Sequence, residues 1–426
     1  MTYKSVKGTK DLLPKDTAAW LHVERVIREV MDAYRYGEIR TPAFEDTAVF
    51  ARGIGEETDI VGKEMYTFTD KGGSSLTLRP EMTAPVIRAF IQHSMGEQTS
   101  INKLYYIGPM FRQERPQAGR FRQFHQFGFE CIGQQSPVCD AEIIMMAAEI
   151  YRRLGIRFTL KINSVGDPTC RPQYRAALQE FLRDVHDDLS PESQRRAETN
   201  PMRVLDSKDP RDRELTAGAP EILDYLSDEC RDHFHATLAL LDAMGIAYEV
   251  DPRLVRGLDY YTMTAFEFVS ADLGSQDALG GGGRYDGLVS QLGGKDTPAV
   301  GFAAGLERLL MVMEKNGYTF PEQSPRVYLV GMDENSRAWA FQQAVSLRRS
   351  GVSVELDYAE RSVKAQMREA NRLGARYVVL AGEAEMQTST AQVKDMQEGT
   401  QESVEFERLA EYFIQVPQSS DTMENS

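Results

Sequence analysis

Residues 103–132 read KLYYIGPMFRQERPQAGRFRQFHQFGFECI and hold two apolar, aromatic-rich runs on either side of a polar loop. Runs of this composition, separated by turn-forming residues, predict the strands of an antiparallel hairpin at 103–111 and 123–132. Within 103–122 five basic residues stand against one acidic residue, Glu114, which gives a local charge of +4. Arginine offers phosphate oxygens a planar fork of donors, and aromatic faces stack on bases. We therefore interpret the loop as an anion-binding site, with a solvated hairpin loop as the alternative.

The charge of this loop is opposite to the charge of the whole chain. The 426 residues contain 49 Lys plus Arg and 64 Asp plus Glu, a net charge of −15. This charge excludes a protein that coats nucleic acid by bulk attraction, but it allows a local basic site. The length predicts two or three domains, because single cores rarely exceed about 250–300 residues. No apolar run approaches the roughly 18 residues of a membrane helix, and the first residues lack the apolar core of a signal peptide.

The cysteines and histidines show no metal-binding spacing. Cys131, Cys139, Cys170 and Cys230 form no CxxC pair, and the six histidines are scattered along the chain. We therefore expect no bound metal ion at a protein site, and reduced thiols in a cytoplasmic protein that does not contact membranes.

Hydrophobic spacing predicts an α+β domain over residues 1–320. Its strands come in hairpins, so its sheet should be mainly antiparallel. Residues 171–252 are rich in charged residues and helix formers and lack a β-rich run, which predicts a mainly helical insertion within this domain. The other expected elements are a helix from about Thr17 that stops near Gly37, an edge strand or bend at Pro42, a hairpin at Met65–Leu78, a helix at Thr83–Ile91, strands at Tyr261–Val269 and Leu279–Gly283, and a helix beginning near Gly301.

A second domain is expected at residues 325–417, after a cluster of Gly, Pro and Ser at 317–325. Its strands alternate with helices, which predicts a parallel sheet with crossover helices, an α/β arrangement. The polar residues 418–426 are expected to be disordered. The expected elements are strands at Val327–Val330, Val352–Leu356 and Tyr377–Leu380, and helices at Ser336–Arg349 and Ser362–Leu373.

The second domain carries a basic stripe. Lys364, Arg368 and Arg372 are spaced i, i+4, i+8 on the expected helix, with Arg361 and Arg376 nearby. Such a stripe is either a solvated face or a phosphate contact.

Three further segments combine glycine with charged or aromatic residues. Residues 254–261 read LVRGLDYY, a polar cluster between apolar flanks. Residues 280–286 read GGGGRYD, where four glycines allow a ligand to approach the backbone or form a flexible turn. Residues 301–308 read GFAAGLER, which places Arg308 either in a site or at the surface of a buried helix. No segment matches a P-loop or the GxGxxG fingerprint.

Glu130 and Gln126 lie four residues apart on an expected strand, so both side chains point to the same face. Glu130 is surrounded by aromatic and aliphatic residues. A carboxylate there costs free energy unless it is paired or protonated. It is either a receptor for a cationic or hydrogen-donating ligand or part of a structural salt bridge.

These segments together resemble the histidyl-tRNA synthetase family of class II aminoacyl-tRNA synthetases. Residues 111–114 with the Arg-rich loop and Phe124 resemble motif 2, residues 301–308 resemble motif 3, and Pro42 resembles the motif 1 proline of the dimer interface. Residues 256–261 and 280–286 resemble the two signatures peculiar to the histidine enzymes. The segments KGTKDLLP at 7–14 and Val393–Asp395 also resemble the family, so the likeness covers essentially the whole chain.

The resemblance implies that histidine and ATP give histidyl-adenylate and pyrophosphate, and that the histidyl group then moves to the 3′ end of histidine tRNA. Arg112 and Arg256 would be catalytic. Arg112 would hold the α-phosphate, and Arg256 would act on the α-phosphate or on the histidine carboxylate. Histidine would be bound by Glu81, Thr83, Gln126, Glu130, Tyr260, Tyr261 and Tyr285. ATP, with Mg²⁺, would be bound by Arg112, Glu114, Arg120, Phe124 and Arg308.

The same resemblance implies a homodimer, no tightly bound prosthetic group, an insertion over the acceptor stem, and an anticodon-binding role for the C-terminal domain. One residue departs from the family pattern, because Met82 stands where glycine is expected, and this puts the local backbone in question. Two alternatives remain at this stage. They are a non-catalytic regulatory paralogue, such as the regulatory subunit of ATP phosphoribosyltransferase, and a class II synthetase of another specificity. The presence of Arg112, Arg256 and Arg308 argues against the first.

Overall fold

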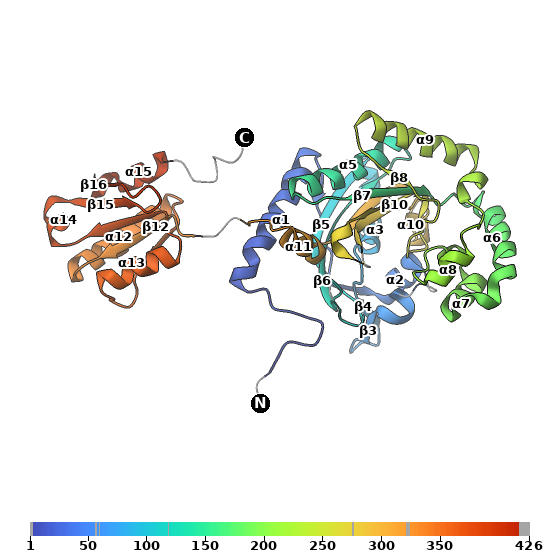
Figure 1. Ribbon diagram of the computed structural model, residues 1–426, viewed down its shortest axis with the longest axis horizontal. Helices are drawn as coiled ribbons and strands as arrows, with labels where there is room; N and C mark the ends of the chain where they lie inside the picture. The colour runs from blue at the N-terminus through green and yellow to red at the C-terminus, as the bar shows by residue number, and fades with distance from the viewer. Residues whose placement is uncertain are drawn as a thin grey trace. The chain divides into compact units, whose positions relative to one another are not determined.

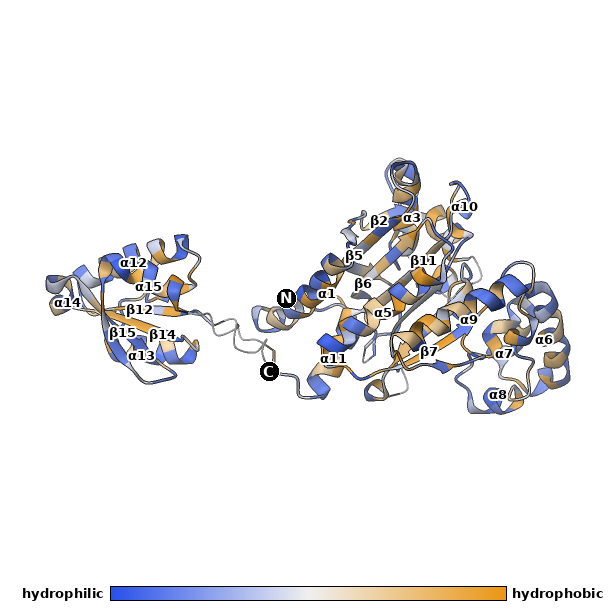
Figure 2. Cartoon of the chain, turned by 90° about the horizontal axis from the view of Figure 1, so that it is seen from above, coloured by the Kyte–Doolittle hydropathy of each residue, from blue (hydrophilic) through white to orange (hydrophobic). Residues whose placement is uncertain are grey.

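The computed structural model describes residues 3–55, 58, 60–117, 119–274, 277–320 and 324–416. The chain divides into two compact units, 1–321 and 322–426, which are described separately (Figure 1). In the second unit the strand β12 (Val327–Gly331) is apolar and buried along its whole length, while the helices around it carry hydrophilic residues (Figure 2). Among the described residues, no helix is long and apolar enough to cross a membrane.

The first unit is built on one large sheet. Its two end pairs, β1 with β5 and β7 with β8, are parallel, and all the pairs between them are antiparallel. The prediction of a mainly antiparallel sheet is therefore confirmed. In order across the sheet, the strands are β1 (Gly37–Glu38), β5 (Asn102–Phe111), β6 (Gln123–Ile132), β11 (Ala299–Gly305), β10 (Ala278–Arg284), β9 (Thr262–Val269), β7 (Thr159–Ser164) and β8 (Glu249–Val250).

A smaller three-stranded sheet contains the other predicted hairpin. Its order is β2 (Phe44–Asp46), β4 (Ser75–Leu78) and β3 (Tyr66–Thr69). The helix α3 (Thr83–Gln92) follows β4 directly, as its apolar spacing predicts. Pro42 lies between β1 and β2, outside both strands.

The two faces of the large sheet have different residues. Because side chains alternate along a strand, one face collects phenylalanines from the strands β6, β11 and β9. These pack as a core under the helices α1 (Pro14–Ala33), α5 (Pro137–Arg153) and α11 (Leu306–Lys315). The opposite face has small and polar residues at its centre. There Glu130 lies directly across from Gly301, which lies across from Gly283. The phenylalanines are Phe127, Phe129, Phe266, Phe268 and Phe302.

Two sequence predictions in this unit are wrong. No helix begins near Gly301: residues 299–305 form the strand β11, and the helix starts at Leu306. A run of glycine and alanine has little preference of its own, and here it is held in the sheet by β6 and β10 on either side. The first helix stops at Ala33, where Arg35 supplies the left-handed turn with φ of 63°, and Gly37 already belongs to β1.

The segment 171–252 is mainly helical, as expected. Apart from the two-residue strand β8, its regular structure is helical, and it has a core of its own around Tyr174, Leu178 and Cys230. The side chains of Ser190, Asp209 and Ser227 cap three of its helices. These helices are α6 (Arg171–Val185), α7 (Pro191–Thr199), α8 (Pro210–Leu215) and α9 (Asp228–Ala243).

The second unit contains a five-stranded sheet with helices beside it. The strands β13, β12 and β14 are parallel, as predicted, but β15 and β16 add an antiparallel hairpin that the sequence analysis missed. That hairpin is mostly polar and forms the edge of the sheet, so it lacks the apolar run of a buried strand. The predicted tail at 418–426 lies outside the described residues.

The elements of this unit follow one another along the chain. They are β12 (Val327–Gly331), α12 (Glu334–Arg349), β13 (Val354–Leu356), α13 (Val363–Arg372), β14 (Tyr377–Ala381), α14 (Glu383–Thr388), β15 (Thr390–Asp395), β16 (Gln401–Glu405) and α15 (Leu409–Gln415).

A buried ion network ties the large sheet to its covering helices. Arg284, the last residue of β10, is fully buried and binds the equally buried carboxylate of Asp140 on α5. It also donates to Asp286 at 3.0 Å and to two backbone carbonyls, while His233 on α9 lies 3.2 Å from Asp140. Each charge is therefore paired, which is the condition under which burial of charge is tolerated.

Replacement of Arg284 by methionine should destabilise the first unit by about 3–5 kcal/mol, because it leaves the Asp140 carboxylate buried without its main partner. The chain has only two tryptophans. In a Trp339→Phe background, urea unfolding followed by fluorescence of Trp20 therefore reports on this unit alone. As a control, Arg25→Met removes an exposed ion pair with Glu29 and should change little. A loss below about 1 kcal/mol for Arg284→Met would show that the network is not stabilising.

Candidate active site

A cavity of about 290 Å³ opens on the small-residue face of the large sheet. Its walls come from β6, β9, β10 and β11, the start of α3, the loop before β9 and the loop between β5 and β6. The structure brings together in it every residue singled out from the sequence as a site residue. These are Glu81, Thr83, Arg112, Glu114, Arg120, Phe124, Gln126, Glu130, Arg256, Tyr260, Tyr261, Tyr285 and Arg308.

Glu130 lies at the inner end of the cavity and is completely buried. Its carboxylate accepts hydrogen bonds from the hydroxyls of Thr83 at 2.9 Å, Tyr106 at 3.3 Å and Tyr285 at 2.5 Å. Burial raises the pKa of Glu130 to about 8, although the hydroxyls of Tyr285 and Thr83 oppose this shift. No basic side chain pairs with it among the described residues, so the structural salt bridge weighed from the sequence is not formed.

Glu81 is the second buried carboxylate of the cavity. It accepts the backbone N–H groups of Thr83 at 2.7 Å and Ala84 at 2.9 Å, the free donors at the start of α3. Burial raises the pKa of Glu81, and the two N–H groups oppose the shift. Met82, between them, has ordinary backbone angles (φ −115°, ψ −14°) and a buried side chain, so methionine at this position does not strain the backbone.

Gln126 lies two residues before Gly128 on β6, on the same face as Glu130. Its amide oxygen is buried and has no hydrogen-bond partner among the described residues. A buried acceptor of this kind costs free energy unless something donates to it. Because Gln126 lines the cavity, a bound ligand is the natural donor.

Two glycines make room for the charged groups of the cavity. A Cβ atom at Gly301 would lie 1.6 Å from Glu130 Oε2, and one at Gly281 would lie 2.6 Å from Arg256 Nη1. The carboxyl of Glu130 and the guanidinium of Arg256 therefore lie against strand backbone, at positions where a side chain would collide with them. The glycine run at 280–283 is strand rather than flexible turn, and what it accommodates includes protein side chains.

Arg256 and three tyrosines form the wall beside Glu130. The guanidinium of Arg256 lies over the ring of Tyr261 at 5.7 Å and binds the carboxylate of Glu267 at 2.7 Å, while its Nε has no hydrogen-bond partner among the described residues. Tyr260 packs against Tyr261 and Tyr285, with ring centroids 4.8 and 5.5 Å away. The arginine is thus held in place with one donor group still available to a ligand.

The outer part of the cavity carries three more arginines. Arg112 stacks on the ring of Phe124 at 5.1 Å and donates from Nε to the carbonyl of Pro80 at 2.9 Å. Arg120 pairs with Glu114 at 3.2 Å. Arg308 is largely buried and donates to the carbonyl of Ala278 at 2.6 Å, so it is a cavity residue and not a surface arginine. This concentration of guanidinium groups suits a polyphosphate.

The sequence analysis missed three residues of the site. Glu267 pairs with Arg256, Tyr106 donates to Glu130, and Glu307 accepts the backbone N–H of His125 through both carboxylate oxygens at 3.0 Å. Each lies on a predicted element whose period fixes the face it occupies. The alternation of side chains therefore indicated which face Glu267 and Tyr106 occupy. It did not give the strand register that places them next to their partners.

Comparisons with known proteins agree on one family. The profile described as histidyl-tRNA synthetase matches residues 8–309, and that of an anticodon binding domain matches residues 326–415. A histidine–tRNA ligase of Desulforamulus reducens is 50% identical over 405 residues, covering 95% of this chain and 97% of that protein. One of Chloroherpeton thalassium is 52% identical over 410 residues, covering 95% and 96%. The crystal structure of apo S. aureus histidyl-tRNA synthetase matches with a TM-score of 0.82 and 40% identity, covering 97% of this chain and 100% of that one.

The raised pKa of Glu130 predicts how stability depends on pH. In the folded chain this carboxyl keeps its proton up to about pH 8, whereas in the unfolded chain it ionises near the ordinary glutamate pKa of 4.5. The folded state binds the extra proton between these values, so its stabilising effect is full below about pH 4.5 and is lost as pH rises towards 8. The loss should be on the order of a few kcal/mol.

Glu130→Gln cannot titrate, so its free energy of unfolding should fall less between pH 5 and pH 8 than that of the unchanged chain, with Trp20 fluorescence as the readout. Glu198→Gln, at an exposed carboxyl of the same unit, is the control and should keep the original slope. Equal slopes for Glu130→Gln and the unchanged chain would refute the assignment of a buried, protonated Glu130.

Proposed function

The chain belongs to the histidyl-tRNA synthetase family, and from that premise we propose how the residues of its cavity bind the substrates and carry out the reaction. The chain is a histidine–tRNA ligase, a class II aminoacyl-tRNA synthetase that uses ATP to attach histidine to its tRNA. The observation that carries the proposal is the buried, unpaired carboxyl of Glu130 among hydroxyl groups. It makes the inner pocket selective for a side chain that can exchange a proton.

The imidazole of histidine would occupy the inner pocket, between Glu130 and Tyr261, with Tyr260 and Tyr285 as walls. The empty pocket holds one proton on Glu130 near neutral pH, since burial raises its pKa to about 8. A neutral imidazole can accept that proton, and an imidazolium can pair with the carboxylate, so both forms of histidine are accommodated. A pocket that requires two polar partners discriminates strongly against isosteres that lack them, because its own buried groups would be left unpaired.

The amino end of histidine would lie near the start of α3. Glu81 is held there by the backbone of Thr83 and Ala84, and the free oxygen of Gln126 lacks a donor among the described residues. An ammonium group offers three donors, which matches Glu81, Thr83 and Gln126. Because the α-amino group and the imidazole are then both fixed, the carboxylate points towards Arg256 and the outer cavity.

MgATP would fill the outer cavity. Phe124 would stack on the adenine, with Arg308 towards the γ-phosphate and Arg112 at the α-phosphate. Glu114 is held by Arg120, and both belong to the loop after β5, which we assign to contacts with ATP and the tRNA acceptor end. The Mg²⁺ ion enters as part of the nucleotide, bound to phosphate oxygens.

The first chemical step is an in-line substitution at phosphorus. An oxygen of the histidine carboxylate attacks the α-phosphorus, the bond to the bridging oxygen breaks, and pyrophosphate leaves with the electron pair. Arg112 and Arg256 approach the α-phosphate from two sides and stabilise the charge that builds on its oxygens. Arg256 needs no reorganisation to do this, because Glu267 and Tyr261 already fix its plane. In the second step a ribose hydroxyl of the tRNA end attacks the histidyl carbonyl and AMP leaves.

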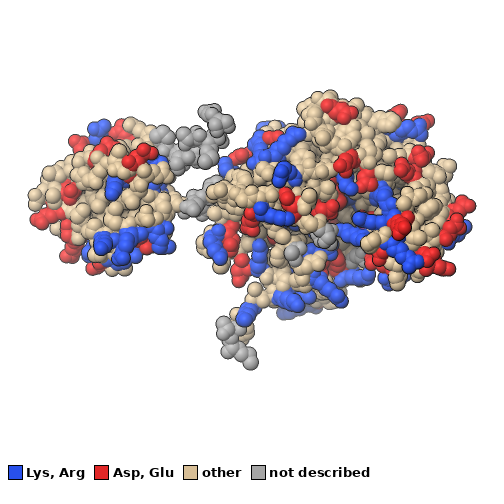
Figure 3. Space-filling view, viewed as in Figure 1, with Lys and Arg blue, Asp and Glu red and all other residues tan. Residues whose placement is uncertain are grey.

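The remaining assignments concern the domains and partners. We assign 1–320 to catalysis, 171–252 to an insertion that contacts the acceptor stem, and 325–417 to anticodon binding. In the second unit, Lys and Arg gather on the face where α13 lies (Figure 3). On this helix Lys364 and Arg368 form no ion pair among the described residues, which leaves them available to phosphate, whereas Arg372 pairs with Glu369. We further propose a cytoplasmic homodimer in which the free cysteines stay reduced.

The two alternatives weighed from the sequence are not favoured. Relatives about 50% identical over 95% of the chain are histidine–tRNA ligases, and the chain retains the C-terminal unit and the arginines of the cavity. These observations support an active enzyme of histidine specificity.

The purified chain should catalyse exchange between ATP and pyrophosphate only when histidine is present, among the twenty amino acids. The exchange measures adenylate formation without tRNA, so it tests the proposed pocket directly. If none of the twenty amino acids drives exchange, the enzymatic proposal is overturned. If a different amino acid drives it, the proposed histidine specificity is overturned.

Arg256→Ala should lower histidine-dependent exchange by at least about 100-fold, because it removes a positioned donor to the α-phosphate. The circular dichroism spectrum should be unchanged. Arg231→Ala, at an exposed arginine of α9, is the control and should keep normal exchange. Since Arg256→Ala leaves Glu267 unpaired, Arg256→Ala/Glu267→Ala should be measured too. Recovery of exchange in this double variant would mean that the arginine only neutralises Glu267.

A further inference from the structure

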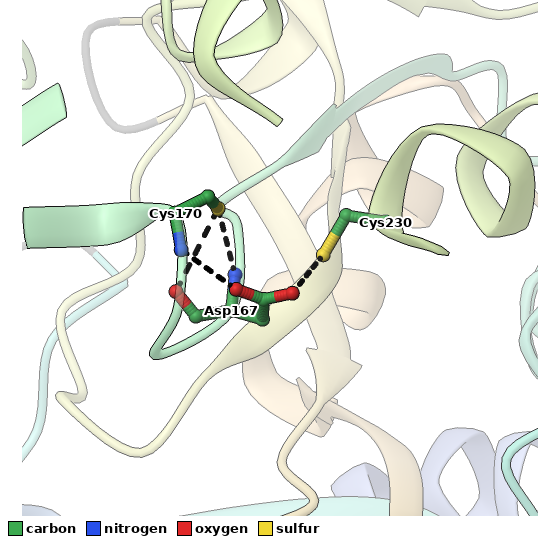
Figure 4. Close-up of side chains that lie close together, drawn as sticks. All are labelled: Asp167, Cys170 and Cys230. Atoms are coloured by element: carbon green, nitrogen blue, oxygen red, sulfur yellow. Dashed lines mark hydrogen bonds between the residues drawn. The ribbon is translucent and has the colours of Figure 1, made fainter. Parts of the chain in front are cut away.

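Two chain segments meet at the base of the helical insertion: the loop that leads into α6 and the start of α9. Asp167 and Cys170 lie in the loop between β7 and α6, and Ser227 and Cys230 lie at the start of α9, about sixty residues later (Figure 4). The ligand atoms of Asp167, Cys170 and Cys230 all lie within 4.8 Å of one another. Both segments place their polar side chains three residues apart, which is the spacing of two-ligand turns in zinc sites.

We propose that Asp167, Cys170 and Cys230 bind a zinc ion at the base of the insertion. The donor set of two sulfurs and one carboxylate oxygen is one that Zn²⁺ accepts in tetrahedral geometry. Zn–S bonds of about 2.3 Å place two bound sulfurs about 3.8 Å apart. A small decrease in the distances between the ligand atoms is therefore enough to bind the ion. Ser227 Oγ lies 2.7 Å from Asp167 Oδ2, and in this proposal it supplies the fourth ligand or holds a bound water.

The two oxygens of Asp167 have separate tasks. Oδ1 accepts the backbone N–H groups of Thr169 at 2.8 Å and Cys170 at 2.9 Å and so fixes the turn. Oδ2 faces the other segment, where it accepts from Ser227 Oγ at 2.7 Å and from the thiol of Cys230 at 3.1 Å. The ion would replace the Cys230 proton on this second oxygen, while the turn stays as it is.

The sulfur of Cys170 is placed as an acceptor. It receives the backbone N–H of Asp167 at 3.2 Å, a contact that orients and stabilises a thiolate ligand. A Cβ atom at Gly166 would lie 2.7 Å from this sulfur, so the glycine, with φ of 68°, makes room for it. Binding takes both thiols to thiolates and releases two protons to water, with no change in oxidation state.

The charge of the site is balanced by a neighbouring arginine. Zinc with two thiolates and one carboxylate carries a net charge of −1. Arg171, next to Cys170, is half-buried and interacts electrostatically with all three ligands. It donates from Nε to the carbonyl of Val165 at 2.9 Å and from its Nη2 to the carbonyl of Tyr261. The ion would therefore fix both the base of the insertion and an arginine that contacts the inner pocket.

The test uses the full chain, stripped of metal by a chelator and titrated with Zn²⁺ against a chromophoric competitor. We expect one ion per chain and a proton release of two per ion. Cys170→Ala and Cys230→Ala should each weaken binding at least tenfold, whereas Cys139→Ala, at a thiol outside the cluster, should not. Equal binding by Cys170→Ala/Cys230→Ala and the unchanged chain would overturn the proposal. So would a chain that binds no zinc but forms a Cys170–Cys230 disulfide on mild oxidation.

A gain-of-affinity variant guards against loss of folding in the alanine variants. Ser227→Cys should bind Zn²⁺ more tightly, and with Co²⁺ its sulfur-to-metal absorption should increase by about half, as expected when three thiolates replace two. The matched control is Ser193→Cys, a buried serine of α7 outside the cluster, which should leave affinity unchanged. No gain of affinity in Ser227→Cys would show that the fourth position is misplaced and would overturn the geometry.

Discussion

The active site depends on the absence of side chains at the centre of the large sheet. Gly301 and Gly281 leave room for the carboxylate of Glu130 and the guanidinium of Arg256 to lie against the backbone of β11 and β10. The same strands present Phe302 and its neighbours to the other face, where they pack under α1, α5 and α11. The sheet thus separates an apolar core on one face from a polar cavity on the other. Both arise because successive side chains along a strand point to opposite faces.

Burying the carboxyl group of Glu130 in this cavity costs free energy, and its hydrogen bonds offset that cost only in part. Three hydroxyls donate to Glu130, yet burial still raises its pKa to about 8. A salt bridge would have satisfied the group better, and it would also have occupied the position proposed for the imidazole. We propose that this unpaired carboxyl, which lowers stability, serves ligand selection. Arg284, the last residue of β10 in the same sheet, is the opposite case. Its buried charge is fully paired, and it serves the fold alone.

Much of the fold could be predicted from local patterns, and the failures have specific causes. The two hairpins and the helix at Thr83 follow from alternation and period, which need no knowledge of the partners. The prediction for residues 299–305 was wrong because a run of glycine and alanine shows no hydrophobic period. Only the neighbouring strands decide between strand and helix there. The hairpin of β15 and β16 was missed because its strands, on one side of the sheet, are mostly polar and lack an apolar run. The cavity residues could be chosen from a family resemblance, but the pairing of Arg256 with Glu267 requires the register of β9 and could not.

The cysteine cluster was missed for a related reason, and it bears on how the insertion is attached. Its side chains are recognisable as a set only when the loop before α6 and the start of α9 are brought together, since neither segment carries a CxxC pair. Where they meet, Asp167 accepts the backbone N–H of Cys170 just before α6, and the next residue, Arg171, donates to the backbone carbonyl of Tyr261 in the inner pocket. The chain crossing that carries the insertion and the wall proposed to bind histidine are therefore consecutive parts of one hydrogen-bonded path. Arg171 therefore links the start of the insertion to Tyr261, and a change in the turn at Asp167 is expected to reach the pocket through this hydrogen bond.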